Sequence, residues 1–189
     1  MIIDGKTLHM GGWCIGKKAL EWMDSNIRIT NENVIHRAVA DFKNMHRFAN
    51  RKTLKFKHEK KFAYNIDLLH THQYAYQAPL LRARHIYYTY LKLIKAATRE
   101  IVLIAPYFVP GRRLLREILK AKRRGVDVHI ILPQNTDYKT VDIAAHTFFT
   151  KLLRYNIRIH QYPEMLHAKV AVIDDAVFIG SLNLDNVSL

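Results

Sequence analysis

The stretch LHAKVAVIDDAVFIGSLNLD, residues 166–185, decides the fold that the sequence predicts. Its apolar run 170–173 is short and rich in valine and isoleucine, which is typical of a buried strand. Asp174-Asp175 is a turn signal, and the apolar residues 176–179 then predict a return strand. The stretch therefore predicts a β-hairpin whose open ends lie side by side.

Polar side chains gather at the open end of this hairpin. His167 and Lys169 are two residues apart, so they project to the same side of an extended chain, and Ser181 and Asn183 follow the return strand. An imidazole can attack phosphorus or protonate a leaving alkoxide, a lysine binds phosphate oxygens, and neutral donors stabilise developing charge. The set favours chemistry on a phosphodiester. No carboxylate or Cys/His cluster accompanies it, so we expect no metal and no other cofactor.

The order of these residues resembles a known signature. H-x-K-x-x-x-x-D followed by G-S-x-N is similar to the motif of the phospholipase D superfamily. The segments IAPYFVP, 104–110, and AKRRGVDVHIILP, 121–133, resemble its bacterial cardiolipin synthase branch. One departure concerns the hairpin, since five residues separate Asp174 from Gly180 where the family pattern has six. Such a change moves side chains to the opposite face of a strand unless the turn absorbs it.

The resemblance implies roles for the motif residues. It implies catalytic work for His167, Lys169 and Asp174, with Asp174 supporting the motif structurally, and phosphate binding for Ser181 and Asn183. In this family one histidine attacks phosphorus and a second protonates the leaving group. The nucleophile is usually assigned to the first of two motifs, so the resemblance implies an acid–base role for His167.

The N-terminal residues resemble the end of a first motif copy. MIIDGKTLHMGG predicts two strands joined at Asp4-Gly5, with Asp4 in the place of the motif aspartate and Gly11-Gly12 six residues further on. Cys14 stands where the motif has asparagine. We therefore expect residues 1–78 to be the tail of a first phospholipase D-like half and residues 79–189 to be the second half.

Strands and helices alternate in the second half, which predicts an α/β sandwich with a largely parallel central sheet. We expect an amphipathic helix over 111–124 whose stripe Leu114, Leu115, Ile118 and Leu119 packs on that sheet. The other expected strands are 62–69, 101–105, 126–132 and 157–160, and the other expected helices are 31–50, 85–97 and 140–155.

The composition favours an anionic partner. The net charge is +14 and the single cysteine excludes an internal disulfide. A net positive charge of this size favours binding to an anionic membrane surface or to nucleic acid, and charge alone does not distinguish between the two. The basic run 51–61 is most simply a solvated surface. No apolar run approaches the length of a membrane span, so we expect a cytoplasmic protein, peripheral at the inner membrane.

Three functions remain open from the sequence. The resemblance implies a cardiolipin synthase-like phosphatidyltransferase or phosphodiesterase that acts on phosphatidylglycerol-like lipids. The alternatives are a nuclease-like phosphodiesterase, which could work as a homodimer, and an inactive fragment that binds anionic membrane or nucleic acid. Because the sequence shows one complete H-x-K-x-x-x-x-D motif, we expect this chain to be far less active than a relative with two.

Overall fold

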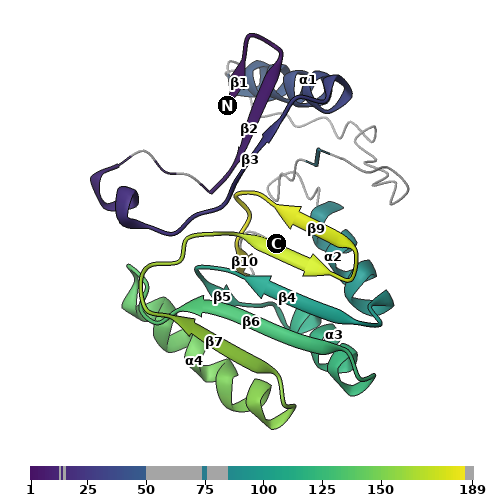
Figure 1. Cartoon of the computed structure of the whole chain (residues 1–189), viewed down its shortest axis with the longest axis vertical. Helices are drawn as coiled ribbons and strands as arrows, with labels where there is room; N and C mark the ends of the chain where they lie inside the picture. The colour runs from purple at the N-terminus through teal and green to yellow at the C-terminus, as the bar shows by residue number, and fades with distance from the viewer. Residues whose placement is uncertain (13, 15, 50–73, 76–84, 186–189) are drawn as a thin grey trace. The chain divides into compact units, whose positions relative to one another are not determined.

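The structure is a computed structural model that describes residues 1–12, 14, 16–49, 74–75 and 85–185 (Figure 1). The chain forms two compact units, one of residues 1–9 with 28–89 and one of residues 10–27 with 90–189. The basic run 51–61, the strand expected over 62–69 and the boundary expected at residue 78 lie outside the described residues.

The N-terminal residues form a small sheet in the strand order β1-β2-β3. Its strands are β1 (Ile2–Ile3), β2 (Thr7–Gly11) and β3 (Asn26–Ile29), and β1 pairs antiparallel with β2. The 3-10 helix η1 (Lys17–Glu21) lies between β2 and β3, and α1 (Glu32–Ala49) follows. The side chain of Asn31 accepts a hydrogen bond of 3.2 Å from the backbone N–H of Val34, which caps α1 as an Asx residue at a helix start should.

The second unit contains a five-stranded sheet in the order β7-β6-β4-β8-β9. The strands are β4 (Glu100–Ile104), β6 (Asp127–Pro133), β7 (Arg158–Tyr162), β8 (Val170–Ile173) and β9 (Ala176–Ile179). The helices are α2 (His85–Ala96), α3 (Arg112–Arg123) and α4 (Lys139–Arg154), and α3 and α4 lie behind the sheet in Figure 1. A separate parallel pair joins β5 (Phe108–Val109) to β10 (Leu184–Asp185).

The α/β class is confirmed, and the sheet is mixed. Strands β4, β6 and β7 are parallel because a helix crosses between each pair, as βα connections require. The motif hairpin then adds β8 antiparallel to β4 and β9 antiparallel to β8. The parallel pairing expected for most of the sheet therefore covers the β7-β6-β4 side, and the hairpin makes the other side antiparallel.

Alternation along the strands directs one face of the sheet into the core. Ile101 and Leu103 of β4 and Val128 and Ile130 of β6 are fully buried. The predicted stripe of α3 is also buried, which confirms that this helix packs by its apolar face. Since strand β8 begins beside the carboxyl end of β4, with Val170 opposite Ile104, the residues just before β8 lie at that edge of the sheet.

Candidate functional site

The backbone ahead of β8 is paired with a distant segment of the same compact unit. The N–H of Met23 donates to the carbonyl oxygen of Met165 at 2.9 Å, and the N–H of His167 donates to the carbonyl oxygen of Met23 at 2.7 Å. Met23 and Leu166 thereby form a parallel bridge. This pairing carries the flanking residues Trp22 and Asp24 to the side chain of His167.

The imidazole of His167 is held on two sides. Its Nδ1 lies 2.9 Å from Oδ2 of Asp24, and its Nε2 lies 2.7 Å from Nζ of Lys169. The ring of Trp22 contacts it with 4.8 Å between ring centroids. Only 12% of the His167 side chain and 9% of the Asp24 side chain are exposed, so this contact is largely withdrawn from water. The two-residue spacing of His167 and Lys169 did bring their side chains together.

The partners of His167 define which nitrogen carries the proton. A charged lysine is a donor only, so Nε2 of His167 accepts from Lys169 when both groups are in their ordinary states. Asp24 as a carboxylate is an acceptor only, so Nδ1 of His167 donates to it. The neutral ring therefore holds its proton on Nδ1 and presents the lone pair of Nε2. An Asp–His pair of this kind orients an imidazole for acid–base work at Nε2.

Lys169 is buried to an unusual degree for a lysine. It is 7% exposed, and its Nζ also donates to the carbonyl oxygen of His167 at 2.6 Å. Burial lowers its pKa from 10.5 to about 8, while the carboxylates of Asp24 and Asp137 oppose that change. Asp137 itself accepts a hydrogen bond of 2.6 Å from the hydroxyl of Tyr107, which follows β4. A phosphate oxyanion beside this ammonium would favour its charged form.

Asp174 lies at the other end of β8 from Lys169. Five residues of extended chain separate the two, about 16 Å. Its carboxylate accepts hydrogen bonds from the backbone N–H groups of Thr98, Arg99 and Glu100 at 2.9, 3.0 and 3.1 Å. These hydrogen bonds lower the pKa of Asp174 to about 2, and the one from Thr98 has the largest effect. The structure therefore places Asp174 at the start of β4, away from His167, where it fastens the hairpin turn.

Ser181 and Asn183 follow β9 at the open end of the hairpin. The N–H of Gly180 donates to the carbonyl oxygen of Lys169 at 3.3 Å, which closes this end. Ser181 is exposed. Oδ1 of Asn183 is buried and has no hydrogen-bond partner within the described parts of the chain. Its amide oxygen is therefore an acceptor with spare capacity.

The motif hairpin has one residue fewer between Asp174 and Gly180 than the family pattern, and the turn is where the residue is missing. In the N-terminal hairpin Ile3 pairs with Thr7, so three residues, beginning with Asp4, form the turn. In the motif hairpin Ile173 pairs with Ala176, so two residues form it. In both hairpins the first paired residue of the return strand lies four positions before the glycine, Thr7 before Gly11 and Ala176 before Gly180. The turn absorbs the deletion, and Asp4 and Asp174 share a positive φ of 50° in their turns.

Sequence reasoning missed Trp22 and Asp24, because neither belongs to a motif copy and no local periodicity marks them. Gly12 carries one signal that could have pointed to them. A Cβ at Gly12 would lie 2.5 Å from Oδ1 of Asp24, so this position has room only for glycine. The predicted glycine pair thus leaves space for the carboxylate that holds His167.

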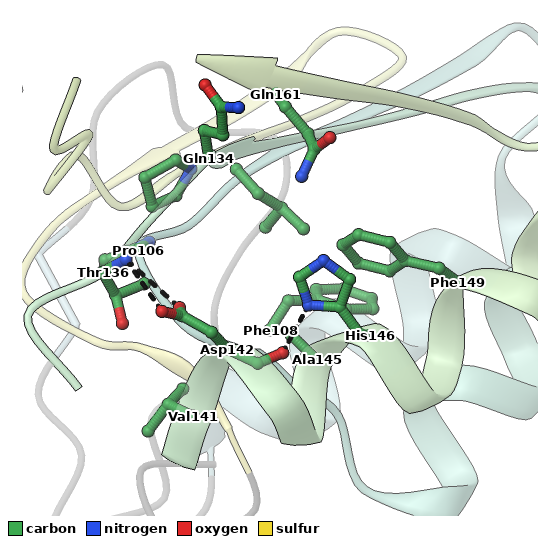
Figure 2. Close-up of a pocket in the computed structure, with 12 residues that line it drawn as sticks. Pro106, Phe108, Gln134, Thr136, Val141, Asp142, Ala145, His146, Phe149 and Gln161 are labelled. Atoms are coloured by element: carbon green, nitrogen blue, oxygen red, sulfur yellow. Dashed lines mark hydrogen bonds between the residues drawn. The ribbon is translucent and has the colours of Figure 1, made fainter. Parts of the chain in front are cut away.

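A separate hollow lies between the carboxyl end of β6 and α4 (Figure 2). Nδ1 of His146 lies 2.6 Å from the carbonyl oxygen of Asp142, and the Asp142 carboxylate accepts from the N–H of Thr136 at 3.2 Å. Figure 2 shows Gln134 and Gln161 on the opposite wall. None of the predicted site residues lines this hollow, and its hydrogen bonds hold the loop between β6 and α4.

The described residues contain neither a metal-binding cluster nor a membrane-spanning helix. No group of three or more His, Cys, Asp or Glu side chains in these parts of the chain could hold a metal ion. Within the same residues, no helix has both the length and the hydropathy to cross a bilayer.

Comparison with known families gives a match over the larger part of the second compact unit. A family model described as "Cardiolipin synthase, PLD-like domain" matches residues 90–189. The proteins named cardiolipin synthase A from Yersinia pseudotuberculosis and Yersinia pestis are 37% identical over 122 residues. The match covers 64% of this chain and 25% of each relative, so it spans about a quarter of the length of these proteins.

Solved structures with a similar chain trace include two bacterial proteins. Nuc from Salmonella typhimurium, described as a phospholipase D family member, is 25% identical with a TM-score of 0.43, over 54% of this chain and 66% of that one. NucT from Helicobacter pylori is 24% identical with a TM-score of 0.44, over 56% of this chain and 70% of that one.

Proposed function

Since the chain belongs to the family of cardiolipin synthase, phospholipase D-like domains, we propose that it provides one half of a phosphatidyltransferase site. The substrates are phosphatidylglycerol-like lipids, and the protein works at the surface of the inner membrane. Transfer to a second lipid alcohol gives a cardiolipin-type product, and transfer to water gives hydrolysis. The observation that carries this proposal is the imidazole of His167 fixed between Asp24 and Lys169.

His167 is the acid–base group in this proposal. A nucleophilic imidazole forms a P–N bond while the P–O bond to the departing glycerol breaks. His167 enters this step as the imidazolium, protonated on both nitrogens, and gives its Nε2 proton to that oxygen. In the second step His167 takes the proton of the acceptor hydroxyl as its oxygen displaces the imidazole from phosphorus. Asp24 orients the ring and stabilises its protonated form. Without the general acid the reaction would slow by about 10²–10⁴.

Lys169 binds the phosphate oxygens, with Ser181 and Asn183 as neutral partners. Its ammonium is already buried, so a phosphate that enters meets a charge that water screens little. The amide nitrogen of Asn183 and the hydroxyl of Ser181 donate to phosphate oxygens. Asp174 has a structural role, because it bonds to backbone N–H groups at the far end of β8.

The described contacts of His167 do not supply the attacking imidazole. Within the described residues, the hydrogen bonds and ring contacts of His167 involve Trp22, Asp24 and Lys169, and none of these is an imidazole. In this proposal residues 1–78 are the tail of the first half, with Asp4 as its motif aspartate, and residues 79–189 are the second half. The second imidazole belongs to a first-half H-x-K motif or to a second copy of this chain.

The test is turnover of phosphatidylglycerol in detergent micelles, with lipid products separated by thin-layer chromatography. We expect slow formation of cardiolipin or phosphatidic acid by the wild-type chain, with a second copy of the chain supplying the attacking imidazole, and no product from His167→Ala. His160→Ala, which removes an exposed histidine of β7, is the matched control and should keep the wild-type rate. Turnover that survives His167→Ala would overturn the proposal.

The same preparations separate the alternatives. Light scattering gives the molar mass, and an oligonucleotide replaces the lipid in a parallel assay. Cleavage of the oligonucleotide that depends on His167, without turnover of lipid, would establish the nuclease-like function instead. If neither substrate is turned over, even by a dimer, the result would favour an inactive fragment that binds anionic membrane or nucleic acid.

A further inference from the structure

The exposed face of α3 consists entirely of basic side chains. At 100° per residue, the exposed residues of this helix and its C-terminal cap lie within an arc of about 120°. They are Arg112, Arg113, Arg116, Lys120, Arg123 and Arg124. The rest of the circumference is mostly apolar and buried, so packing against the sheet does not require these charges. We call this set the α3 basic face.

The one acidic residue of α3 does not cancel this face. Glu117 has a side chain that is 6% exposed, and it lies 3.2 Å from Lys120 and 3.6 Å from Arg116. These pairs fix the direction of two cations but leave a large excess of positive charge on the surface. Arg123 is held by a hydrogen bond of 2.5 Å to the hydroxyl of Tyr155 and keeps its charge.

The neighbouring helix extends the same charge. Arg124 donates to the carbonyl oxygens of Ile94 and Ala97 at 2.9 and 3.2 Å, which ties the end of α3 to the end of α2. Lys92 and Lys95 of α2 are exposed. The basic surface therefore continues from α3 to this part of α2.

The row of charges starts at the edge of the sheet that carries His167. Helix α3 begins shortly after the carboxyl end of β4, which lies beside the start of β8. A rise of about 1.5 Å per residue puts Arg112 and Arg123 about 16 Å apart along the helix axis. A flat anionic surface can contact the whole row at once.

We propose that the α3 basic face docks the protein on an anionic phospholipid bilayer, an inference that rests on the proposed lipid substrate. Cations near such a surface are attracted by its negative potential, and each adds to binding without any need for a shaped pocket. The face has no aromatic, Asn, Gln, Ser or Thr side chain. Single-stranded nucleic acid is bound through stacking aromatics, and base edges are read by polar side chains. The absence of both argues against single-stranded or base-specific recognition. The proposed lipid substrate then favours a bilayer over the phosphate backbone of a duplex.

The test compares two triple variants of the whole chain for binding to vesicles. Vesicles of phosphatidylcholine alone and of phosphatidylcholine with phosphatidylglycerol are separated from free protein by flotation. The docking variant carries Arg112→Gln, Arg116→Gln and Lys120→Gln. The control loses three exposed cations of α4, with Lys139→Gln, Lys151→Gln and Arg154→Gln, so both variants change the net charge equally. Circular dichroism melting checks that both fold.

We expect wild type to bind only the phosphatidylglycerol vesicles, and to lose binding as salt rises from about 0.05 to 0.5 M. The docking variant should bind about tenfold or more weakly, and the control should stay within about twofold of wild type. Equal loss in both variants, or full binding by the docking variant, would overturn the proposal. Loss of oligonucleotide binding with unchanged vesicle binding would assign the face to nucleic acid.

Turnover in micelles keeps this inference separate from the proposed function. Micelles of phosphatidylglycerol in neutral detergent offer no bilayer, so the docking variant should keep the wild-type rate there. A wild-type protein that binds vesicles through α3 but turns over no lipid would refute the proposed function and leave the docking surface intact. A docking variant that fails in micelles as well as on vesicles would contradict a role in docking alone.

Discussion

The carboxylate of Asp24 lies 2.9 Å from Nδ1 of His167, although the two residues are 143 positions apart in the chain. Neither side chain is more than 12% exposed. The contact depends on the backbone pairing of Met23 with residues 165 and 167, and on the absence of a side chain at Gly12. A carboxylate so placed fixes both the tautomer and the direction of the imidazole.

Replacement of this carboxylate by an amide should change the tautomer of His167. In Asp24→Asn the amide can donate as well as accept, so Nδ1 of His167 is no longer restricted to carrying the proton. We expect nitrogen NMR to show the proton on Nδ1 in wild type and a mixture of tautomers in the variant. Turnover should fall about 10²-fold or more, with little change in KM, because the residue positions His167 without binding substrate.

Asp175→Asn is the control for this variant, because Asp175 is a similar carboxylate whose side chain is 91% exposed. Its spectrum and turnover should match wild type. An unchanged His167 tautomer in Asp24→Asn would contradict the orienting role.

Binding of a phosphate-like anion should depend on the titration of Lys169. Burial lowers its pKa to about 8, so the ammonium that attracts the anion is lost as pH rises through that value and not near 10.5. Tungstate keeps its charge over this range and can be followed by calorimetry. We expect its affinity to fall between about pH 7 and 9, and Lys169→Arg to remove that dependence, since arginine stays charged. A wild-type affinity that stays constant to pH 9.5 would refute the lowered pKa.

Loss of the Asp174 carboxylate should destabilise the fold. Three backbone N–H groups would lose a charged acceptor in Asp174→Asn, at a cost of about 1–3 kcal/mol in the free energy of unfolding at pH 7. Urea titration measures this. Asp175→Asn breaks only an exposed pair with Arg99 and should cost less than about 1 kcal/mol. Equal effects of the two substitutions would contradict the structural role of Asp174.

The same carboxylate should govern part of the acid stability. The pKa of Asp174 is about 2 in the folded chain, below the ordinary value of 3.8. The unfolded state therefore binds the proton first, so the stabilisation is complete above pH 3.8 and is lost as pH falls towards 2. Asp174→Asn should show a smaller loss of stability than wild type between about pH 4 and 2. If the stability of wild type and of Asp174→Asn fell equally over this pH range, Asp174 would not be the source of the acid sensitivity.

The motif hairpin should tolerate one extra residue in its turn. A glycine inserted between Asp174 and Asp175 gives the three-residue turn seen after Ile3 and leaves the pairing of β8 with β9 unchanged. We expect hydrogen exchange to show the same protected amides in both strands. A glycine inserted between Val177 and Phe178 instead should shift the register of β9 and abolish that protection, because one residue turns each side chain to the other face. Similar exchange in both insertions would show that the turn does not set the register.

The sequence determined the features that depend on neighbours along the chain. Short apolar runs rich in β-branched residues identified β4, β6, β8 and β9, and helical spacing identified the buried stripe of α3. The H-x-K spacing brought His167 and Lys169 together. Each of these follows from the geometry of a strand, a helix or a turn, which a short stretch of residues specifies. The α/β class and the family followed from the same stretches.

Tertiary structure alone decided the partners of these residues. Asp24 and Trp22 reach His167 from a segment with no periodic pattern, and Asp174, adjacent to the site in the motif, lies at the other end of β8. The sheet is mixed because β4 pairs with β6 on one side and with the hairpin on the other. Such contacts depend on which surfaces bury each other and where hydrogen bonds across the chain are satisfied. The spacing of residues along the sequence predicts neither the buried surfaces nor the hydrogen bonds between distant segments.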